Sequence, residues 1–312
     1  MSMRNKPRVF LLVAVHTLWL ASSAIVKAQQ VANRFESRFR SDTSLVLVPV
    51  TVTDPHSANI NGLERDRFAI LDNGRPQPIS VFYTEDAPCS VGVVLDVSGS
   101  MKRSLDLEKA AVRAFLQASN PEDEFFLVTV SSNPGAITGP VADIREIDNL
   151  ARSATAGGGT SLYDTIYSAL QHGSMFKKQR RALLVISDGM DNLSRYSRRE
   201  LMSMAVESDT QVYTMAIAGT RVGAKGAELA EIQRGLEFMQ DLAKQTGGMN
   251  IRLGDYENPS VAATRLARAL RSQYVIGYRN PDTDQSGKWH RIQVKVNLSK
   301  VNVYARSGYQ SQ

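Results

Sequence analysis

Valines alternate with other side chains along the first patterned stretch of the chain, which predicts a strand with one buried face. Val46, Val48, Val50 and Val52 fall on one side of residues 44–53, because successive side chains of a strand point to opposite faces. Two further short strands are expected at 68–71 and 79–83, with the hairpin turn Asp72-Asn73-Gly74 after the first. The patterned part of the chain therefore begins with a small all-β unit.

From about residue 89 the pattern changes to apolar runs separated by stripes with helical spacing. The runs, which read as buried strands, lie at 91–95, 125–130, 182–186 and 212–217. The helical stripes lie at 105–116, 162–170, 201–206 and 227–245. Continuous apolar strands that alternate with helices predict a doubly wound, Rossmann-like α/β domain with a mostly parallel sheet covered on both faces.

Strand-like alternation returns near the end of the chain. It is visible over 273–278 and again over 292–305. Neither the early nor the late strands can form a stable sheet alone. We therefore expect 43–87 and 273–309 to pair into one β-sandwich, with the α/β domain of 88–272 inserted between them.

The first residues have the pattern of a signal peptide. Three basic residues precede an apolar run over 9–20, and Val26-Lys27-Ala28 fits a cleavage site. The apolar run is short for a membrane span, so cleavage of 1–28 is favoured over a retained anchor. The sequence then predicts an exported protein, periplasmic, cell-surface or secreted, with a disordered lead-in at 29–42 and no membrane span after cleavage.

Signal removal changes the charge balance. The full chain has 37 basic and 31 acidic residues, a formal charge of +6. The predicted signal peptide contains four basic residues and no acidic one, so the mature chain has 33 against 31, or +2. This balance gives little reason to expect nucleic-acid binding. Cys89 is the only cysteine, so no disulfide within the chain is available, and its position beside an apolar strand predicts a buried thiol.

Oxygen-bearing side chains gather where the predicted strands end. Asp96, Ser98 and Ser100 follow the run at 91–95, Thr160 follows three glycines, and Asp188 follows the run at 182–186. Ligands of open α/β sheets collect at the carboxyl ends of the strands, and hard oxygen donors suit small divalent cations. We therefore predict that these five residues form a metal site, most simply for Mg²⁺, with Mn²⁺ or Ca²⁺ as alternatives.

Each of these residues also has an ordinary structural interpretation. Serine and threonine near a helix start are commonly N-caps, and aspartate after a strand is commonly a turn residue. The combination on three loops favours the metal site. A phosphate-binding loop needs a lysine followed by serine or threonine after its glycines. No lysine stands beside Thr160, so nucleotide binding is not expected.

These motifs resemble those of a known family. Asp96-x-Ser98-x-Ser100, Thr160 and Asp188-Gly189 are similar to the metal-ion-dependent adhesion site of von Willebrand factor type A (VWFA) domains, over about 88–253. The flanking motifs are similar to those of a secreted bacterial VWFA-related family. The resemblance implies that the three hydroxyls touch the metal directly and that the two aspartates bind it directly or through water.

Two more acids lie close to these motifs in the sequence. Asp164 and Asp191 are candidates for orienting a bound water or a ligand from outside the coordination sphere. For Asp164, the role of a first-turn acid that favours the start of a helix is an equal alternative.

The function expected from this site is metal-dependent protein binding, for adhesion or complex assembly. Two carboxylates nearly neutralise a divalent ion and leave room for an Asp or Glu carboxylate from a partner. One alternative is a scaffold whose β-sandwich makes the contacts. Another is a metal-dependent hydrolase, which is disfavoured because His56, His172 and His290 lie outside the metal loops and no Gly-x-Ser-x-Gly motif is present. We therefore expect no enzymatic activity.

Overall fold

The computed structural model describes residues 45–173, 176, 178–217, 225–254, 258–280 and 287–311. The predicted signal peptide (1–28) and lead-in (29–42) lie outside these residues. Within the described part of the chain, no helix combines the length and the apolar character needed to cross a membrane.

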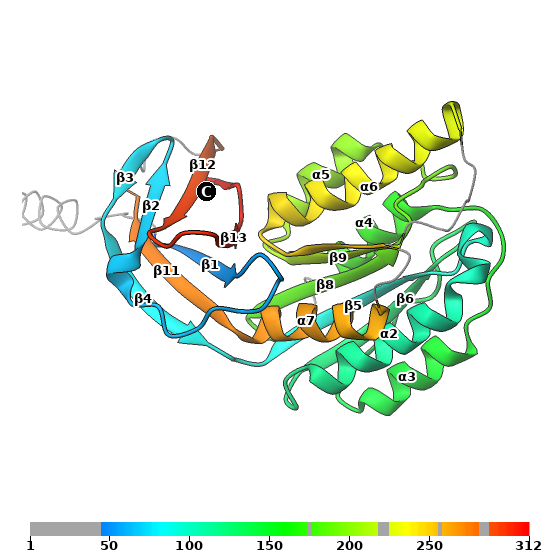
Figure 1. Ribbon diagram of the computed structural model, residues 1–312. Helices are drawn as coiled ribbons and strands as arrows, with labels where there is room; N and C mark the ends of the chain where they lie inside the picture. Colours follow the sequence, from blue (N-terminus) through cyan, green and yellow to red (C-terminus); the bar gives the residue numbers. More distant parts are fainter. Residues whose placement is uncertain are drawn as a thin grey trace, which may run out of the picture. The chain divides into compact units, whose positions relative to one another are not determined.

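A six-stranded sheet forms the centre of the α/β region (Figure 1). Its strand order is β10 (Asn250–Leu253), β9 (Gln211–Ile217), β8 (Arg180–Ser187), β5 (Cys89–Asp96), β6 (Glu124–Val130) and β7 (Thr138–Val141). All neighbours are parallel except β6 and β7, which are antiparallel. Every residue of the central strand β5 is buried, because helices cover both of its faces.

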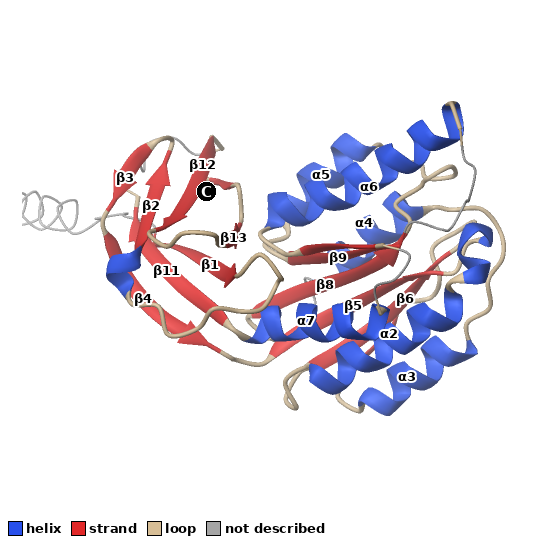
Figure 2. Ribbon diagram, in the orientation of Figure 1, coloured by secondary structure: helices blue, strands red, loops and turns tan. Residues whose placement is uncertain are grey.

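The helices divide into two layers, one on each face of this sheet (Figure 2). One layer contains α2 (Leu105–Ala118), α3 (Ile144–Ser153) and α7 (Pro259–Arg271). The other contains α4 (Leu162–Gly173), α5 (Arg198–Glu207) and α6 (Ala227–Thr246). Alternate residues of β5 enter the two cores, Val93 with the first layer and Val94 with the second. The predicted doubly wound α/β architecture is confirmed.

Two antiparallel sheets flank the α/β region in the sequence and join its two ends. The first has the order β13 (Asn302–Ala305), β1 (Leu45–Thr53), β11 (Gln273–Arg279), β4 (Ile79–Glu85). The second has the order β14 (Gly308–Gln310), β12 (Trp289–Val296), β2 (Phe68–Asp72), β3 (Arg75–Gln77). Early and late strands alternate in the first sheet, and in the second sheet the late strand β12 pairs with the early strand β2, so both sheets combine the two flanking segments. The valines of β1 face its core, where Val48 lies opposite Ile276.

Some elements were not predicted from the sequence. A short 3₁₀ helix, η1 (Arg65–Arg67), precedes β2, and the edge strand β7 and helix α3 follow β6. β7 has only four residues, two of which are Gly139 and Pro140, so it shows no alternation. Only Ile147 and Ala151 of α3 are buried, so its apolar stripe is too thin to stand out.

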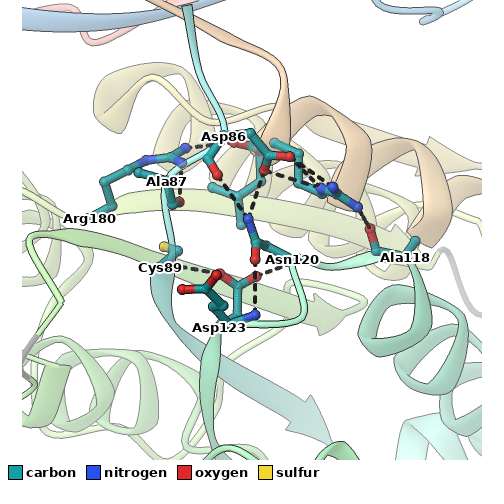
Figure 3. A network of polar contacts seen from close by, with 10 residues as sticks. Asp86, Ala87, Cys89, Ala118, Asn120, Asp123 and Arg180 are labelled. Carbon is teal, nitrogen blue, oxygen red and sulfur yellow. Dashed lines mark hydrogen bonds and ion pairs between the residues drawn. The ribbon is translucent and has the colours of Figure 1, made fainter.

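Arg180 lies where the chain passes between the sandwich and the α/β region (Figure 3). Its guanidinium donates to the carbonyl oxygens of Ala87 and Leu270, both at 2.6 Å, and to Oε1 of Gln273 at 2.9 Å. One side chain at the amino end of β8 therefore holds both connecting segments.

Asp86 adds a second set of contacts at the same amino end of the sheet (Figure 3). Arg271 forms an ion pair with it at 2.8 Å, and Asn120 donates to its carbonyl oxygen at 2.8 Å. Burial acts to raise the pKa of Asp86, but the hydrogen bonds of Arg271 and Asn120 and the charge of Arg271 outweigh it, so the pKa lies below its ordinary value. The residues Asp86, Asn120, Arg180 and Arg271 are called the amino-edge network below.

Candidate metal centre

Asp96 is the last residue of β5 and the most constrained side chain of the candidate site. It is fully buried. Its Oδ1 accepts the N–H of Ser98 at 2.9 Å, and its Oδ2 accepts the hydroxyl of Ser187 at 2.6 Å. The second bond connects the end of β5 to the end of β8, which places Asp96 next to the loop that carries Asp188.

The two serines of the motif lie side by side after β5. Ser98 directly precedes the 3₁₀ helix η2 (Gly99–Arg103), and Ser100 is its second residue. Their Oγ atoms are 3.1 Å apart. Ser98 is buried and Ser100 is half-buried. The tight turn therefore brings two hydroxyl oxygens together at the carboxyl edge of the sheet.

The glycine loop packs against this turn through backbone contacts. Gly99 donates its N–H to the carbonyl of Gly158 at 3.0 Å, and Gly157 donates to the carbonyl of Val97 at 2.8 Å. Gly158 has φ +80°, and a Cβ there would lie 2.6 Å from Oγ of Ser132. Glycine meets both requirements because it has no Cβ.

Thr160 is held through its backbone by Asn192. Its N–H donates to Oδ1 of Asn192 at 2.9 Å, and its carbonyl accepts the N–H groups of Asn192 and Leu193, both at 3.0 Å. Thr160 is buried, and no hydrogen bond to its hydroxyl is found within the described residues. The side-chain oxygen is thus left for another ligand.

Asp188 follows β8 and has one carboxylate oxygen without a protein partner in the described part of the chain. Its Oδ1 accepts the N–H of Met190 at 3.0 Å. The next residue, Gly189, has φ +79°, and a Cβ there would lie 2.2 Å from the carbonyl oxygen of Gly235 in α6. Close packing of this loop against α6 fixes the position of Asp188.

The charge of this site is unbalanced. Burial raises the pKa of Asp96 to about 6, and the negative charge of Asp188 adds to this, against the hydrogen bonds from Ser187 and Ser98. No basic side chain bonds either aspartate among the described residues. Two buried carboxylates without a basic partner, beside three hydroxyls, fit a divalent cation. No group of three or more His, Cys, Asp or Glu side chains in the described chain could hold a metal, so the hydroxyls are essential to this donor set.

Asp164 and Asp191 hold residues 194–196, which follow Asp188 in the chain. Oδ1 of Asp164 accepts the N–H groups of Arg195 and Tyr196, both at 2.9 Å. Oδ1 of Asp191 accepts the hydroxyl of Ser194 at 2.5 Å and the N–H of Tyr163 at 3.2 Å. Through these bonds both acids connect the start of α4 to residues 194–196.

Two residues that hold candidate ligands, Ser187 and Asn192, were not identified from the sequence, and neither was the buried acid Glu108. Ser187 ends an apolar strand directly before Asp188, which is a signal for a polar role. Glu108 lies three residues after Leu105 and four before Val112, on the buried stripe of α2. An acid on an apolar stripe could have been noticed. Nothing local in the sequence indicates that the Asn192 side chain holds Thr160, because the contact joins two separate loops.

Residues 91–190 match the model of the von Willebrand factor type A domain. A search of curated proteins finds no match to the chain.

Among solved structures, the chain is similar to BatB from Bacteroides thetaiotaomicron, with 17% identity, 59% of this chain and 98% of that chain covered, and a TM-score of 0.45. It is also similar to a von Willebrand factor type A protein from Catenulispora acidiphila, with 12% identity, coverage of 85% and 73%, and a TM-score of 0.49. A third is proximal thread matrix protein 1 from the mussel byssus with a zinc-occupied MIDAS motif, with 12% identity, coverage of 64% and 49%, and a TM-score of 0.47. The family match over residues 91–190 and the mostly parallel sheet agree with a type A fold for this part of the chain.

Proposed function

We propose that this chain is a metal-dependent protein-binding module for adhesion or complex assembly. The observation that carries the proposal is the pair of buried carboxylates Asp96 and Asp188, which have no basic partner among the described residues and follow neighbouring strands at the edge where Ser98 and Ser100 also lie. The type A family match over residues 91–190 supports an interaction module. The proposal includes export after cleavage of 1–28, with the type A domain at 88–272 inserted between the sandwich segments 43–87 and 273–309.

The hydrogen bonds indicate which residues would bind the cation directly and which would bind it through water. Ser98, Ser100 and Thr160 would contact the cation directly through their hydroxyls. Asp188 has an oxygen without a protein partner and would also bind directly. Both oxygens of Asp96 already accept hydrogen bonds, which favours contact through water. Mg²⁺ suits this set best, because it is commonly held by few carboxylates and retains waters.

The partner follows from the charge of the donor set. Two aspartates nearly neutralise a divalent ion, and the hydroxyls add no charge, so the ion can still attract an anion. An Asp or Glu carboxylate of a protein partner is the simplest such ligand. The histidines with described surroundings support binding over hydrolysis. His290 bonds Asp72 in the sandwich at 2.9 Å, and His172 packs on Phe126 near the end of α4, so neither belongs to the metal loops.

The first test of the proposal is stabilisation by Mg²⁺. A ligand at a hundred times its Kd raises the free energy of unfolding by about 2.7 kcal/mol. We expect an increment of this order for the wild type in thermal unfolding, and none for Asp188→Ala or Asp96→Ala. Asp86→Ala is the matched control, because it removes a carboxylate of the amino-edge network and should keep the full increment.

Partner capture tests the second half of the proposal. Wild type and Asp96→Ala, each immobilised, are compared for binding of envelope proteins with Mg²⁺ and with a chelator. We expect capture that is lost by chelation and by the substitution, and that is suppressed when acidic side chains of the extract are amidated. Capture that survives both chelation and Asp96→Ala would contradict metal-dependent binding.

A further inference from the structure

Glu108 is a buried acid that the proposed ligand set does not use. It lies on α2 between Leu105 and Val112 and has no solvent-exposed surface. Burial of an ionised carboxylate without a compensating partner is costly. Among the described residues no ion pair reaches Glu108. Its protonation state therefore needs an explanation in terms of its neighbours.

The groups around Glu108 provide too few hydrogen-bond donors to satisfy both oxygens of an ionised carboxylate. Oγ of Ser104 lies 2.6 Å from Oε1 of Glu108 and 3.1 Å from the carbonyl oxygen of Met101. Oε2 of Glu108 is buried and has no hydrogen-bond partner among the described residues. A serine hydroxyl has one hydrogen, and a carbonyl oxygen can only accept. Each contact of Ser104 can be a full two-centre hydrogen bond only if the carboxyl of Glu108 donates one of them, since otherwise one hydrogen is shared by two acceptors.

We propose that Glu108 is held as a neutral carboxylic acid that donates a hydrogen bond to Ser104 and thereby fixes the turn that presents Ser100 to the cation site. Ser104 in turn donates to the carbonyl of Met101 through both its hydroxyl and its N–H, the latter at 2.9 Å. Met101 directly follows Ser100 in η2. Glu108 is a positioning residue, and its link to cation binding rests on the proposed function.

The charged groups around Glu108 support the neutral form. Burial, together with the charges of Asp96 and Asp188, raises the pKa of Glu108 to about 9, against the hydrogen bond of Ser104 and the charge of Lys109. The amino group of Lys109 donates to the carbonyl of Arg152 on α3, at 2.9 Å.

The other helices packed against α2 provide no counter-charge for Glu108. The charged residues of α7 are Arg265, Arg268 and Arg271, and those of α3 are Arg145, Glu146, Asp148 and Arg152. None of them forms an ion pair or hydrogen bond with Glu108 in the described chain. Asp96, Asp188 and Glu108 also do not converge on a common metal position, which separates the role of Glu108 from that of a ligand.

Carbon-13 NMR of glutamate carboxyl groups tests the protonation state directly. Glu108→Gln identifies the Glu108 signal by its disappearance. In the metal-free wild type we expect the shift of a protonated carboxyl at about pH 7 and ionisation near the pKa of about 9. A signal typical of an ionised carboxylate at about pH 7 would overturn the proposal.

The methyl group of Met101, which is fully buried, reports on the turn. Its resonance should shift with pH at the same midpoint as the Glu108 carboxyl in the wild type and stay constant in Glu108→Gln, whose amide keeps a donor for Ser104. A Met101 signal that does not follow the carboxyl titration would contradict the proposed connection from Glu108 through Ser104 to the turn. This comparison needs only the wild type and a conservative variant, so it holds even if Glu108→Ala fails to fold.

Mg²⁺ affinity, measured by calorimetry, tests the link to the site. We expect Glu108→Gln to bind Mg²⁺ within about twofold of the wild type and Glu108→Ala to bind about tenfold more weakly, the factor of one lost hydrogen bond. Equal weakening in both variants would overturn the positioning role. If the wild type itself does not bind Mg²⁺, the proposed function fails, while the two NMR measurements still decide whether Glu108 is a neutral donor.

Discussion

Asp86 at the amino edge of the central sheet differs from Asp96 and Asp188 at its carboxyl edge in the donors that compensate its charge. At the amino edge, Asp86 forms an ion pair with Arg271, and the guanidinium of Arg180 donates hydrogen bonds to three acceptors. At the carboxyl edge, the donors to Asp96 and Asp188 found in the described part of the chain are backbone N–H groups and a hydroxyl. The pKa of Asp86 is lowered, whereas those of Asp96 and Glu108 are raised.

This difference separates structural charge from charge that is left for a ligand. A carboxylate that is satisfied by arginine contributes to the stability of the fold and has little attraction for a cation. A buried carboxylate without a basic partner costs stability until a cation neutralises it. The amino edge therefore fastens the connection to the sandwich, and the carboxyl edge is the edge suited to binding.

Arg180→Met should produce the largest loss of stability. The substitution keeps most of the side-chain volume but removes the donors to Ala87, Leu270 and Gln273. Hydrogen bonds to a charged group contribute about 1.5–3 kcal/mol, and unsatisfied carbonyls add to the loss. We expect the free energy of unfolding in urea to fall by about 3 kcal/mol.

Arg181→Met is the matched control for this variant. Arg181 is the next residue of β8, and no hydrogen bond of its guanidinium is found within the described residues; its Nε is buried without a partner. The control should therefore leave the urea midpoint nearly unchanged. Equal losses in the two variants would show that the amino-edge contacts add no stability beyond packing.

The uncompensated acids of the carboxyl edge should make stability depend on pH. Glu108 has a pKa of about 9 in the folded chain against 4.5 as its ordinary value. Between these values the folded state holds a proton that the unfolded state has lost, so stability falls as pH rises. The slope for one proton is about 1.4 kcal/mol per pH unit. The stabilising contribution of Glu108 is complete below its ordinary pKa and is lost as the pH rises through its pKa in the folded chain.

Urea unfolding with a chelator present, from about pH 7 to about pH 8.5, measures this slope. Asp96, with a pKa of about 6, has largely titrated below that range. Glu108→Gln should flatten the curve, since its amide does not ionise. If the wild type and Glu108→Gln show the same slope, the buried acid of α2 is already ionised in the folded chain.

Much of the fold could be predicted because its signals are local. The alternation of Val46, Val48, Val50 and Val52 identified a half-buried strand, and apolar runs such as 182–186 identified strands buried on both faces. The edge strand β7 and helix α3 gave weaker patterns because they bury little surface. Alternation and helical spacing report burial, so elements with few buried residues are hard to recognise.

For the candidate site, the ligand residues could be predicted from the sequence, but the residues that hold them in place could not. Asp96, Ser98 and Ser100 form a short motif, and Thr160 and Asp188 each stand at the end of a loop or strand. The supports of these residues come from distant positions: Ser187 is 91 residues from Asp96, and Asn192 is 32 residues from Thr160. Such pairs depend on strand order and loop packing, which no local pattern contains.

Two serines that donate to carboxylates at opposite edges give the most delicate comparison. Ser187 donates to Asp96 at 2.6 Å and accepts the N–H of Gly189 at 2.9 Å, while Ser90 donates to Glu124 at 2.5 Å. Asp96 is fully buried and Glu124 is half-buried. Water replaces the lost donor more readily at the half-buried Glu124 than at the fully buried Asp96. We therefore expect Ser187→Ala to lower the free energy of unfolding by about 1–2 kcal/mol and Ser90→Ala by about 0.5 kcal/mol.

The loss in Ser187→Ala should diminish when Mg²⁺ is added, because a cation supplies the compensation that the hydroxyl gave to Asp96, and the loss in Ser90→Ala should be independent of Mg²⁺. The reverse order of losses, or an equal response to Mg²⁺, would mean that the two edges do not differ in the way their charges suggest.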